Sequence, residues 1–362
     1  MRLINCSTLK LEEFVGEDIP PYAILSHTWQ TEEVLLGDIS GAGDKSHLKG
    51  FQKVVHTCRL ANTDGYKYAW VDTCCIDKSS SAELTEAINS MFNWYRSSGR
   101  CYAYLCDFDS RETTSNFSRC RWFTRGWTLQ ELVAPSDIRF YDMNWEYFGS
   151  KSELWAALSA ITGIDRPILD GTSPLFMIST AKKMSWAAYR QTSRVEDVAY
   201  CLLGIFGISM PLVYGEGARA FARLQEEIMK ESNDLTLFAW QAELGDSASY
   251  RGVLARSPRE FANAGDVISS TSNKSNAEFA MTNKGLRIQS ALSRGPCNSL
   301  VMPLNCHQGT GGHNPIGIYL VDIGGGVYVR DLPQKLAPHI TGEVLKNEII
   351  YIMRHISDIR YL

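Results

Sequence analysis

Short apolar runs alternate with amphipathic stretches along the first 150 residues. Such runs stand at 22–25, 68–71 and 102–105, and each has the length and the aromatic or aliphatic content of a buried strand. The two stretches between them repeat apolar residues every three or four positions, as one face of a helix does. Gly65 and Gly99 follow these predicted helices, where a left-handed cap residue is expected. The order βαβαβ favours a parallel sheet with flanking helices on both faces.

Beyond residue 150 the pattern of apolar and polar residues changes twice. A short predicted helix ends before Pro135 and is followed by a strand candidate at 138–142. The pattern then turns helical, and beyond residue 246 short alternating runs are broken by Gly, Asn and Pro. The sequence therefore predicts an α/β domain at 1–150, a helical subdomain at 151–245 packed on it, and a β-rich C-terminal domain at 246–362.

Composition narrows the classes of partner. The formal net charge of −4 gives no basic excess, so neither a nucleic acid nor an anionic membrane is expected as a partner. The N-terminal segment turns polar within a few residues, unlike a signal peptide, and we expect a cytoplasmic protein. The ten cysteines are scattered, which favours reduced and mostly buried thiols. No CxxC or HxxxH pair is present, so no metal site is expected.

Several long sequence segments resemble the characteristic segments of one known family. They are YAILSHTW at 22–29, YAWVDTCCIDK at 68–78, RGWTLQELVAP at 125–135, SRVEDVAYCLLGIFGI at 193–208 and PLVYGEG at 211–217. Together they resemble the fungal heterokaryon-incompatibility (HET) domain family, which is distantly similar to Toll/interleukin-1 receptor (TIR) domains. The resemblance implies a TIR/flavodoxin-like α/β fold and a role in fungal self/non-self recognition and programmed cell death.

The same resemblance implies a catalytic acid. In TIR domains that cleave NAD, this acid is the glutamate of a Trp-x-x-x-Glu motif, a form that Trp127 and Glu131 share here. On a helix the two residues lie one turn apart on one face. A carboxylate there could stabilise the oxocarbenium-like charge that forms when the nicotinamide–ribose bond breaks. The alternative, an acid at a helix start beside a core aromatic residue, stays open.

Other candidate ligand-binding residues stand at the ends of the first two predicted strands. Ser26, His27 and Trp29 follow the first strand, and Asp72 and Asp77 follow the second. Ligands of open α/β sheets bind at these carboxyl ends. His27 is a candidate donor or acid/base, whereas Ser26 is favoured as a turn cap with Trp29 packed below it. One of the two aspartates is expected to cap the next helix and the other to face the crevice.

Three further motifs each allow a functional and a structural interpretation. Arg125 is a candidate for bidentate binding of a pyrophosphate, or else a structural ion-pair partner of Glu131 or Asp72. The adjacent Cys74 and Cys75 are interpreted as packing residues, because no partner that would activate a thiol is visible. The GxGxxA match at 215–220 lies outside the opening βαβ region, so a capped helix start is favoured over a dinucleotide site.

Three functions are compatible with these observations. The first is a TIR-like NAD glycohydrolase, with Glu131 and His27 as candidate catalytic residues, a nucleotide-like ligand, NAD as substrate and no cofactor. The second is a non-catalytic signalling module that acts by self-association. The third is a HET scaffold recruited for cyclisation or rearrangement of small molecules in fungal specialised metabolism, for which an apolar, aromatic-lined pocket would be diagnostic.

Overall fold

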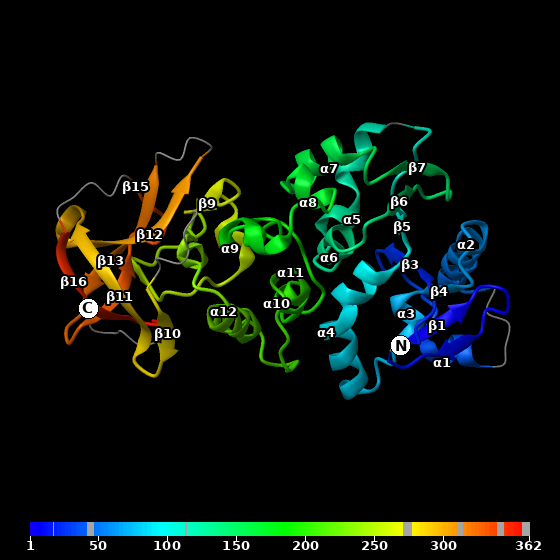
Figure 1. The fold of residues 1–362 in the computed structure, drawn as a ribbon, viewed down its shortest axis with the longest axis horizontal. Coiled ribbons are helices and arrows are strands. Elements are labelled where there is room, and N and C mark those ends of the chain that lie inside the picture. The colour runs from blue at the N-terminus through cyan, green and yellow to red at the C-terminus, as the bar shows by residue number, and fades with distance from the viewer. Residues whose placement is uncertain are drawn as a thin grey trace. The chain divides into compact units, whose positions relative to one another are not determined.

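The computed structural model describes residues 1–16, 18–41, 47–112, 114–270, 277–309, 314–338 and 344–356 (Figure 1). The chain divides into two compact units. Unit 1 holds residues 1–173, 190–192 and 201–212, and unit 2 holds residues 174–189, 193–200 and 213–362.

Unit 1 is built on a seven-stranded sheet in the order β2-β1-β4-β3-β5-β6-β7. The strands are β1 (Arg2–Asn5), β2 (Leu11–Glu13), β3 (Tyr22–His27), β4 (Tyr68–Trp70), β5 (Arg100–Tyr104), β6 (Ile138–Tyr141) and β7 (Tyr147–Ser150). The four central strands β4, β3, β5 and β6 are parallel, and β1, β2 and β7 add antiparallel edges. The parallel sheet expected from the apolar runs is therefore confirmed.

The helices of unit 1 connect and cover this sheet. They are α1 (Leu36–Ser40), α2 (Lys49–Thr63), α3 (Asp72–Cys75), α4 (Ser81–Ser97), η1 (Thr114–Arg119), α5 (Arg121–Thr124), α6 (Thr128–Val133), α7 (Trp155–Thr162), α8 (Arg166–Leu169) and α11 (Leu203–Phe206). Parallel strands are joined by right-handed crossovers. The step from β3 to β4 and the step back across β3 to β5 therefore place α2 and α4 on opposite faces, as Figure 1 shows.

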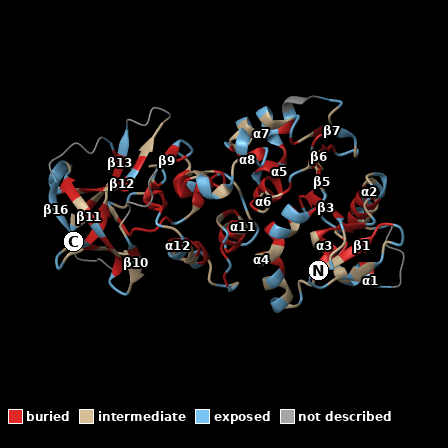
Figure 2. Ribbon diagram, in the orientation of Figure 1, coloured by how far each residue is buried: buried red, intermediate tan, exposed pale blue. Residues whose placement is uncertain are grey.

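The core of unit 1 follows from this layering. All six residues of β3 are buried, and Figure 2 shows the strands as the most continuously buried part of the unit. Gly65, just past α2, has a φ of +85°, so the expected left-handed residue is confirmed there. The same expectation is wrong for Gly99. A Cβ atom at Gly99 would lie 2.4 Å from the ring of Tyr66, so the glycine permits close packing instead.

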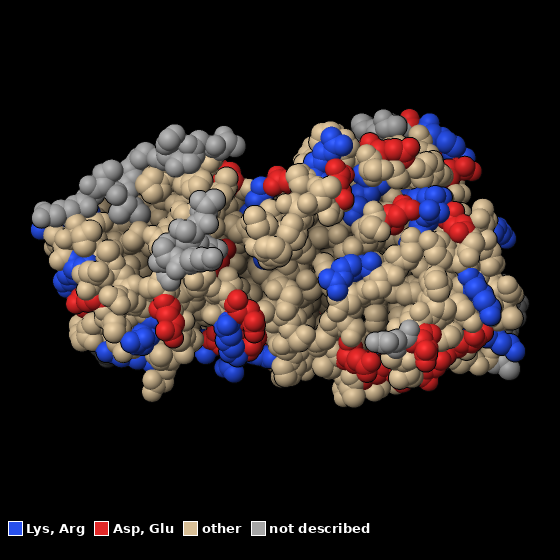
Figure 3. Space-filling view, viewed as in Figure 1, with Lys and Arg blue, Asp and Glu red and all other residues tan. Residues whose placement is uncertain are grey.

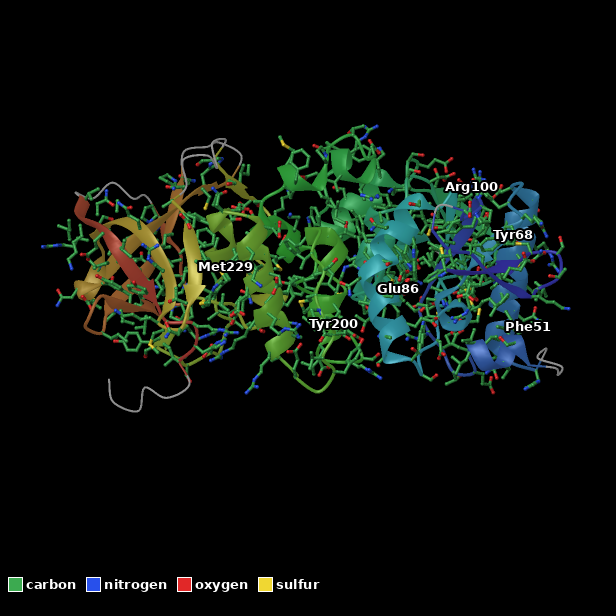
Figure 4. The ribbon with its side chains drawn as sticks, turned by 60° about the horizontal axis from the view of Figure 1, so that its bottom comes forward. Phe51, Tyr68, Glu86, Arg100, Tyr200 and Met229 are labelled. Atoms are coloured by element: carbon green, nitrogen blue, oxygen red, sulfur yellow. The ribbon has the colours of Figure 1, made fainter. Side chains whose placement is uncertain are left out.

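Unit 2 begins with helical segments. They are η2 (Leu175–Met177), α9 (Thr180–Ser185), α10 (Asp197–Tyr200), α12 (Arg219–Glu231), η3 (Leu235–Phe238) and η4 (Pro258–Phe261). Tyr200 on α10 and Met229 on α12 are labelled in Figure 4. The hydroxyl of Tyr200 donates to Glu216 over 2.9 Å, in the loop that leads into α12. In that loop the N–H groups of Gly215 and Gly217 both donate to Glu196, so the GxGxxA segment binds a carboxylate of its own unit and opens a helix.

The second half of unit 2 is β-rich, as expected. Its strands are β8 (Tyr250–Arg251), β9 (Val267–Ser269), β10 (Phe279–Thr282), β11 (Gly285–Arg294), β12 (Leu300–Gln308), β13 (Pro315–Asp322), β14 (Val327–Asp331), β15 (Ala337–Pro338) and β16 (Val344–Ile352), with η6 (Pro296–Asn298) between β11 and β12. Five of them pair in the cycle β11-β16-β14-β13-β12-β11, which closes a small barrel.

The helical region expected at 151–245 is shared between the units, because α7, α8 and α11 belong to unit 1 and α9, α10 and α12 to unit 2. The three-part division at 150 and 245 stays a prediction. Over the described ranges, no helix has the length and apolar character needed to cross a membrane. On the face drawn in Figure 3, Lys and Arg side chains are interspersed with Asp and Glu side chains.

Candidate functional site

The carboxyl ends of β3 and β4 bring two groups of polar side chains to one edge of the unit 1 sheet. Ser26 and His27 are the last two residues of β3, and Asp72 opens α3 directly after β4. Successive side chains of a strand point to opposite faces. Ser26 and His27 therefore anchor two separate groups, which we call the Glu131 cluster and the Asp72 cluster.

The Glu131 cluster consists of Glu131, Ser26, Trp122 and Tyr95. The Ser26 hydroxyl donates to Oε2 of Glu131 over 2.5 Å, and it accepts a hydrogen bond from Nε1 of Trp122 over 2.8 Å. The side chain of Tyr95 lowers the pKa of Glu131, and its hydroxyl donates to the carbonyl oxygen of Leu25 over 2.9 Å. All four cluster residues are buried.

Helix α6 carries Glu131 into this position. All six of its residues are buried, and Glu131 itself is 7% exposed. The Thr128 hydroxyl donates to the carbonyl oxygen of Arg125 over 3.0 Å and also bonds that of Trp122, which ties the start of α6 to α5. A Cβ atom at Gly126 would lie 2.6 Å from Thr192 Cγ2. The Arg-Gly-Trp segment thus needs its glycine for close packing.

Burial raises the pKa of Glu131 to about 8. The hydrogen bond from Ser26 lowers the pKa, and the negative charge of Asp72 raises it, while Arg125 lowers it. A carboxyl group with this pKa is largely protonated at neutral pH. It can hold or release a proton in the pH range in which enzymes work.

The Asp72 cluster consists of Asp72, His27, Trp29, Lys53, Glu33 and Lys78. His27 Nε2 lies 3.0 Å from Oδ1 of Asp72, and the indole Nε1 of Trp29 donates to Oδ2 over 2.8 Å. The Asp72 side chain is 21% exposed and Trp29 is 42% exposed, so this cluster reaches the surface. The Lys78 ammonium lies 3.5 Å from the centroid of the Trp29 ring.

Opposing effects set the charge of Asp72. Burial raises the pKa of its carboxyl group, but the charge of Lys78 and the hydrogen bond from His27 outweigh burial and hold the pKa at about 2. Asp72 is therefore ionised at neutral pH while Glu131 is largely protonated. One edge of the sheet thus carries one proton-holding and one ionised carboxyl group, the pairing that divides acid and base roles in many enzymes.

The remaining sequence candidates lie around these clusters. Arg125 is the C-cap residue of α5, is half-buried, and acts on Glu131 through its charge. Trp127 is the N-cap residue of α6 and is half-buried. The indole that donates to Ser26 belongs to Trp122 instead. Asp77 accepts hydrogen bonds from the N–H and hydroxyl of Ser79 in the turn before α4.

Sequence reasoning missed Trp122, Tyr95, Lys53, Glu33 and Lys78. For Lys53 a signal was available. The buried positions of α2 are 50, 53, 54, 57, 58 and 61, a helical repeat in which a lysine occupies a core position. A lysine that is almost fully buried needs a charged or polar partner, so its place in this repeat indicates a polar cluster.

Comparison with known families identifies the segment that holds most of this edge. The family described as "Heterokaryon incompatibility protein (HET)" matches residues 22–120, from the start of β3 to the N-cap of α5. Residues 22–120 are therefore similar to the HET family. The HET match includes Ser26, His27 and Asp72 and ends before Glu131. A second family, described as a domain of unknown function (DUF8212), matches residues 219–251.

A curated relative supports the same family. Over 228 residues the chain is 46% identical to "Vegetative incompatibility protein HET-E-1" of Podospora anserina, which covers 60% of this chain. The chain spans only 17% of the length of that relative. No solved structure matches the chain.

Proposed function

We propose that this chain acts in heterokaryon incompatibility, with a self-directed cell-death response as its outcome. The HET match over 22–120 and the 46% identity to a vegetative incompatibility protein support this role. We further propose that unit 1 is TIR/flavodoxin-like. In support, its parallel strands lie in the order β4-β3-β5-β6, the second, first, third and fourth in the chain, which is the order at the start of a flavodoxin-like sheet.

The proposed chemistry is hydrolysis of the N-glycosidic bond of NAD at Glu131, which gives nicotinamide, ADP-ribose and a proton. The observation that carries this proposal is the buried Glu131 carboxyl group, held by Ser26 at the carboxyl end of β3 with a pKa of about 8. The nicotinamide ring of NAD is cationic, so binding beside Glu131 would favour the ionised carboxylate. That carboxylate would then stabilise the ribosyl oxocarbenium ion as the neutral nicotinamide leaves.

The ionised Asp72 supports the same reaction. Its exposed side could accept hydrogen bonds from the ribose hydroxyl groups, and Arg125 could bind the pyrophosphate. The Ser26 hydroxyl donates to Glu131 and accepts from the indole N–H of Trp122, and the Tyr95 side chain lowers the pKa of Glu131. These polar contacts favour a nucleotide over the apolar substrate that a recruited enzyme of specialised metabolism would bind.

The test measures nicotinamide release from NAD by the purified chain, in dilute and in concentrated solution. The proposal expects release by wild type and a loss of at least about 100-fold in Glu131→Gln, because a central catalytic group contributes on that order. Asp64→Asn is the matched control. This carboxyl group also accepts a hydrogen bond from a tyrosine hydroxyl, that of Tyr102, but it follows α2, before β4 begins and so at the opposite edge of the sheet.

The outcomes separate the functions. Equal rates in wild type and Glu131→Gln would overturn the role of Glu131. An absence of release by wild type in both solutions would overturn the glycohydrolase proposal and leave self-association without catalysis, which sedimentation velocity over the same concentrations would detect.

A further inference from the structure

The Lys53 ammonium makes three hydrogen bonds inside the Asp72 cluster. Its Nζ lies 3.1 Å from His27 Nδ1 and 3.3 Å from the carbonyl oxygen of Thr28, and it also bonds Oε1 of Glu33. An ammonium group has three donors and no lone pair. All three donors of Lys53 are therefore used, and its side chain is only 5% exposed.

These contacts determine which nitrogen of His27 carries a proton. Because Lys53 only donates, Nδ1 of His27 must accept and hence is bare. Asp72 is a carboxylate and only accepts, so Nε2 must carry the proton and donate to Oδ1 over 3.0 Å. A charged His27 paired with Glu33 does not fit, because Nδ1 lies 3.9 Å from Oε1 of Glu33, too far for a hydrogen bond.

The charged groups around His27 come from three elements: Lys53 on α2, Glu33 in the loop after β3, and Asp72 on α3, with Lys78 beyond it. Lys53 bonds the carboxylate of Glu33 on one side and Nδ1 of His27 on the other. The chain Glu33–Lys53–His27–Asp72 therefore alternates donor and acceptor without a break.

We propose that Lys53 and His27 are positioning residues that fix the Asp72 carboxylate for the hydroxyl groups of a ligand, and that His27 transfers no proton. Both ring nitrogens of His27 are engaged within the protein, and its side chain is 2% exposed. Asp72 is the member of this chain of hydrogen bonds that faces outward, at 21% exposure, with Trp29 bonded to its second oxygen. The identity of the ligand, but not the arrangement of the protons, rests on the proposed function.

The first experiment determines which ring nitrogen of His27 carries the proton. Two-bond ¹H–¹⁵N spectra of the whole chain, labelled with ¹⁵N in its seven histidines, report which ring nitrogens are bare. His27→Gln identifies the signals of His27 by their loss. The inference expects a bare Nδ1 and a protonated Nε2 at neutral pH, and loss of this pattern in Lys53→Met. A protonated Nδ1 in wild type overturns it, whether or not the chain cleaves NAD.

The second experiment separates positioning from proton transfer. A glutamine amide can donate to Asp72 and accept from Lys53, but it cannot shuttle a proton. NAD cleavage should fall no more than about threefold in His27→Gln but about ten- to a hundredfold in His27→Ala, since one charge-assisted hydrogen bond is worth that much. Equal, complete loss in both variants would make His27 an acid or base and overturn the inference.

Lys53 is tested by the same logic. Arginine also only donates, so Lys53→Arg should keep the bare Nδ1 of His27, whereas Lys53→Met should not. Because Lys53→Met leaves the buried Glu33 without its partner, the double variant Lys53→Met/Glu33→Gln provides a version without that unpaired charge. Retention of the bare Nδ1 and protonated Nε2 pattern in the folded double variant would show that Lys53 does not set it.

Discussion

Ser26 and Glu131 are 105 positions apart in the chain, and the hydroxyl of the first donates to the carboxyl group of the second over 2.5 Å. The same hydroxyl accepts the indole N–H of Trp122. One buried oxygen therefore joins the end of β3 to α5 and α6. Ser26 therefore holds α5 and α6 against the end of β3, and its hydrogen bond also lowers the pKa of Glu131.

Ser26→Ala should affect both the stability of the fold and the pKa of Glu131. It leaves the buried N–H of Trp122 without its acceptor, which should lower the free energy of unfolding by about 1–3 kcal/mol. Because the hydrogen bond from Ser26 lowers the pKa of Glu131, its loss should raise that pKa further. Urea unfolding measures the first effect, and a ¹³C titration of the Glu131 carboxyl carbon measures the second.

Ser98→Ala is the matched control. Ser98 is also buried, but its hydroxyl donates only to the carbonyl oxygen of Tyr95, so a cost of about 0.5–1.5 kcal/mol is expected. If Ser26→Ala costs no more than this control and leaves the Glu131 titration unchanged, the hydrogen bond between Ser26 and Glu131 does not have the role inferred here.

The raised pKa of Glu131 predicts a pH dependence of stability. The folded chain holds this proton up to about pH 8, whereas the unfolded chain releases it near the ordinary value of 4.5. The stabilisation is therefore complete below that ordinary value and is lost as the pH rises to about 8, by up to about 1.4 kcal/mol per pH unit. Urea midpoints at pH 5, 6, 7 and 8, in wild type and Glu131→Gln, measure this slope.

The comparison isolates Glu131 because other titrating groups are common to both proteins. The pKa of Asp72 is held at about 2, so its contribution changes only in more acidic solution. Glu131→Gln should flatten the pH profile between 5 and 8. Parallel profiles in the two proteins would mean that Glu131 is already ionised in that range.

The parallel strands of unit 1 were predictable because a buried parallel strand leaves an uninterrupted apolar run. All six positions of β3 are buried, and the pattern at 22–25 carries that signal. The position of the candidate site was predictable, because ligands of open α/β sheets bind at the edge formed by the carboxyl ends of the parallel strands. The division of that edge into two clusters was not, because it depends on which face of β3 each side chain takes.

Contacts between distant segments leave weaker signals. Trp122 and Tyr95 read as ordinary core aromatics, and only the fold shows that they surround Glu131. Gly99 is needed for the ring of Tyr66, a contact that no local pattern encodes. The pairing of β11 with β12, which closes the barrel, was also not predictable, because alternating apolar runs do not determine which strands pair or in which register.

Close packing of α11 on α4 predicts that Gly204 cannot be enlarged. A Cβ atom at this position would lie 2.1 Å from Cβ of Phe92, so Gly204→Ala should destabilise the chain by about 1–3 kcal/mol through overpacking. Gly37→Ala is the control within another short helix, because nothing lies within 4 Å of its added methyl group. It should be neutral or stabilising by up to about 1 kcal/mol. Equal melting temperatures for the two variants would contradict this packing.

Arg330 is fully buried in unit 2, where its guanidinium group lies 3.7 Å from the centroid of the Trp240 ring. It donates to the carbonyl oxygen of Phe238 over 3.0 Å and also to that of Trp240. Burial lowers the pKa of Arg330 to about 9, which measures the cost of placing a charge there. Two charge-assisted hydrogen bonds and a desolvated cation–π contact offset part of that cost.

Arg330→Met should therefore destabilise unit 2 by about 1–3 kcal/mol, since it keeps the apolar stem but removes both donors. Arg330→Lys should not restore stability, because one ammonium cannot stack on the ring and serve both carbonyl oxygens as a planar guanidinium does. Arg259→Met is the control, because this guanidinium lies 5.5 Å from the Tyr189 ring and its side chain is 58% exposed. Hydrogen exchange of the amides in β14 should accelerate in both Arg330 variants and stay unchanged in the control; full protection in Arg330→Met would show that the barrel does not depend on this contact.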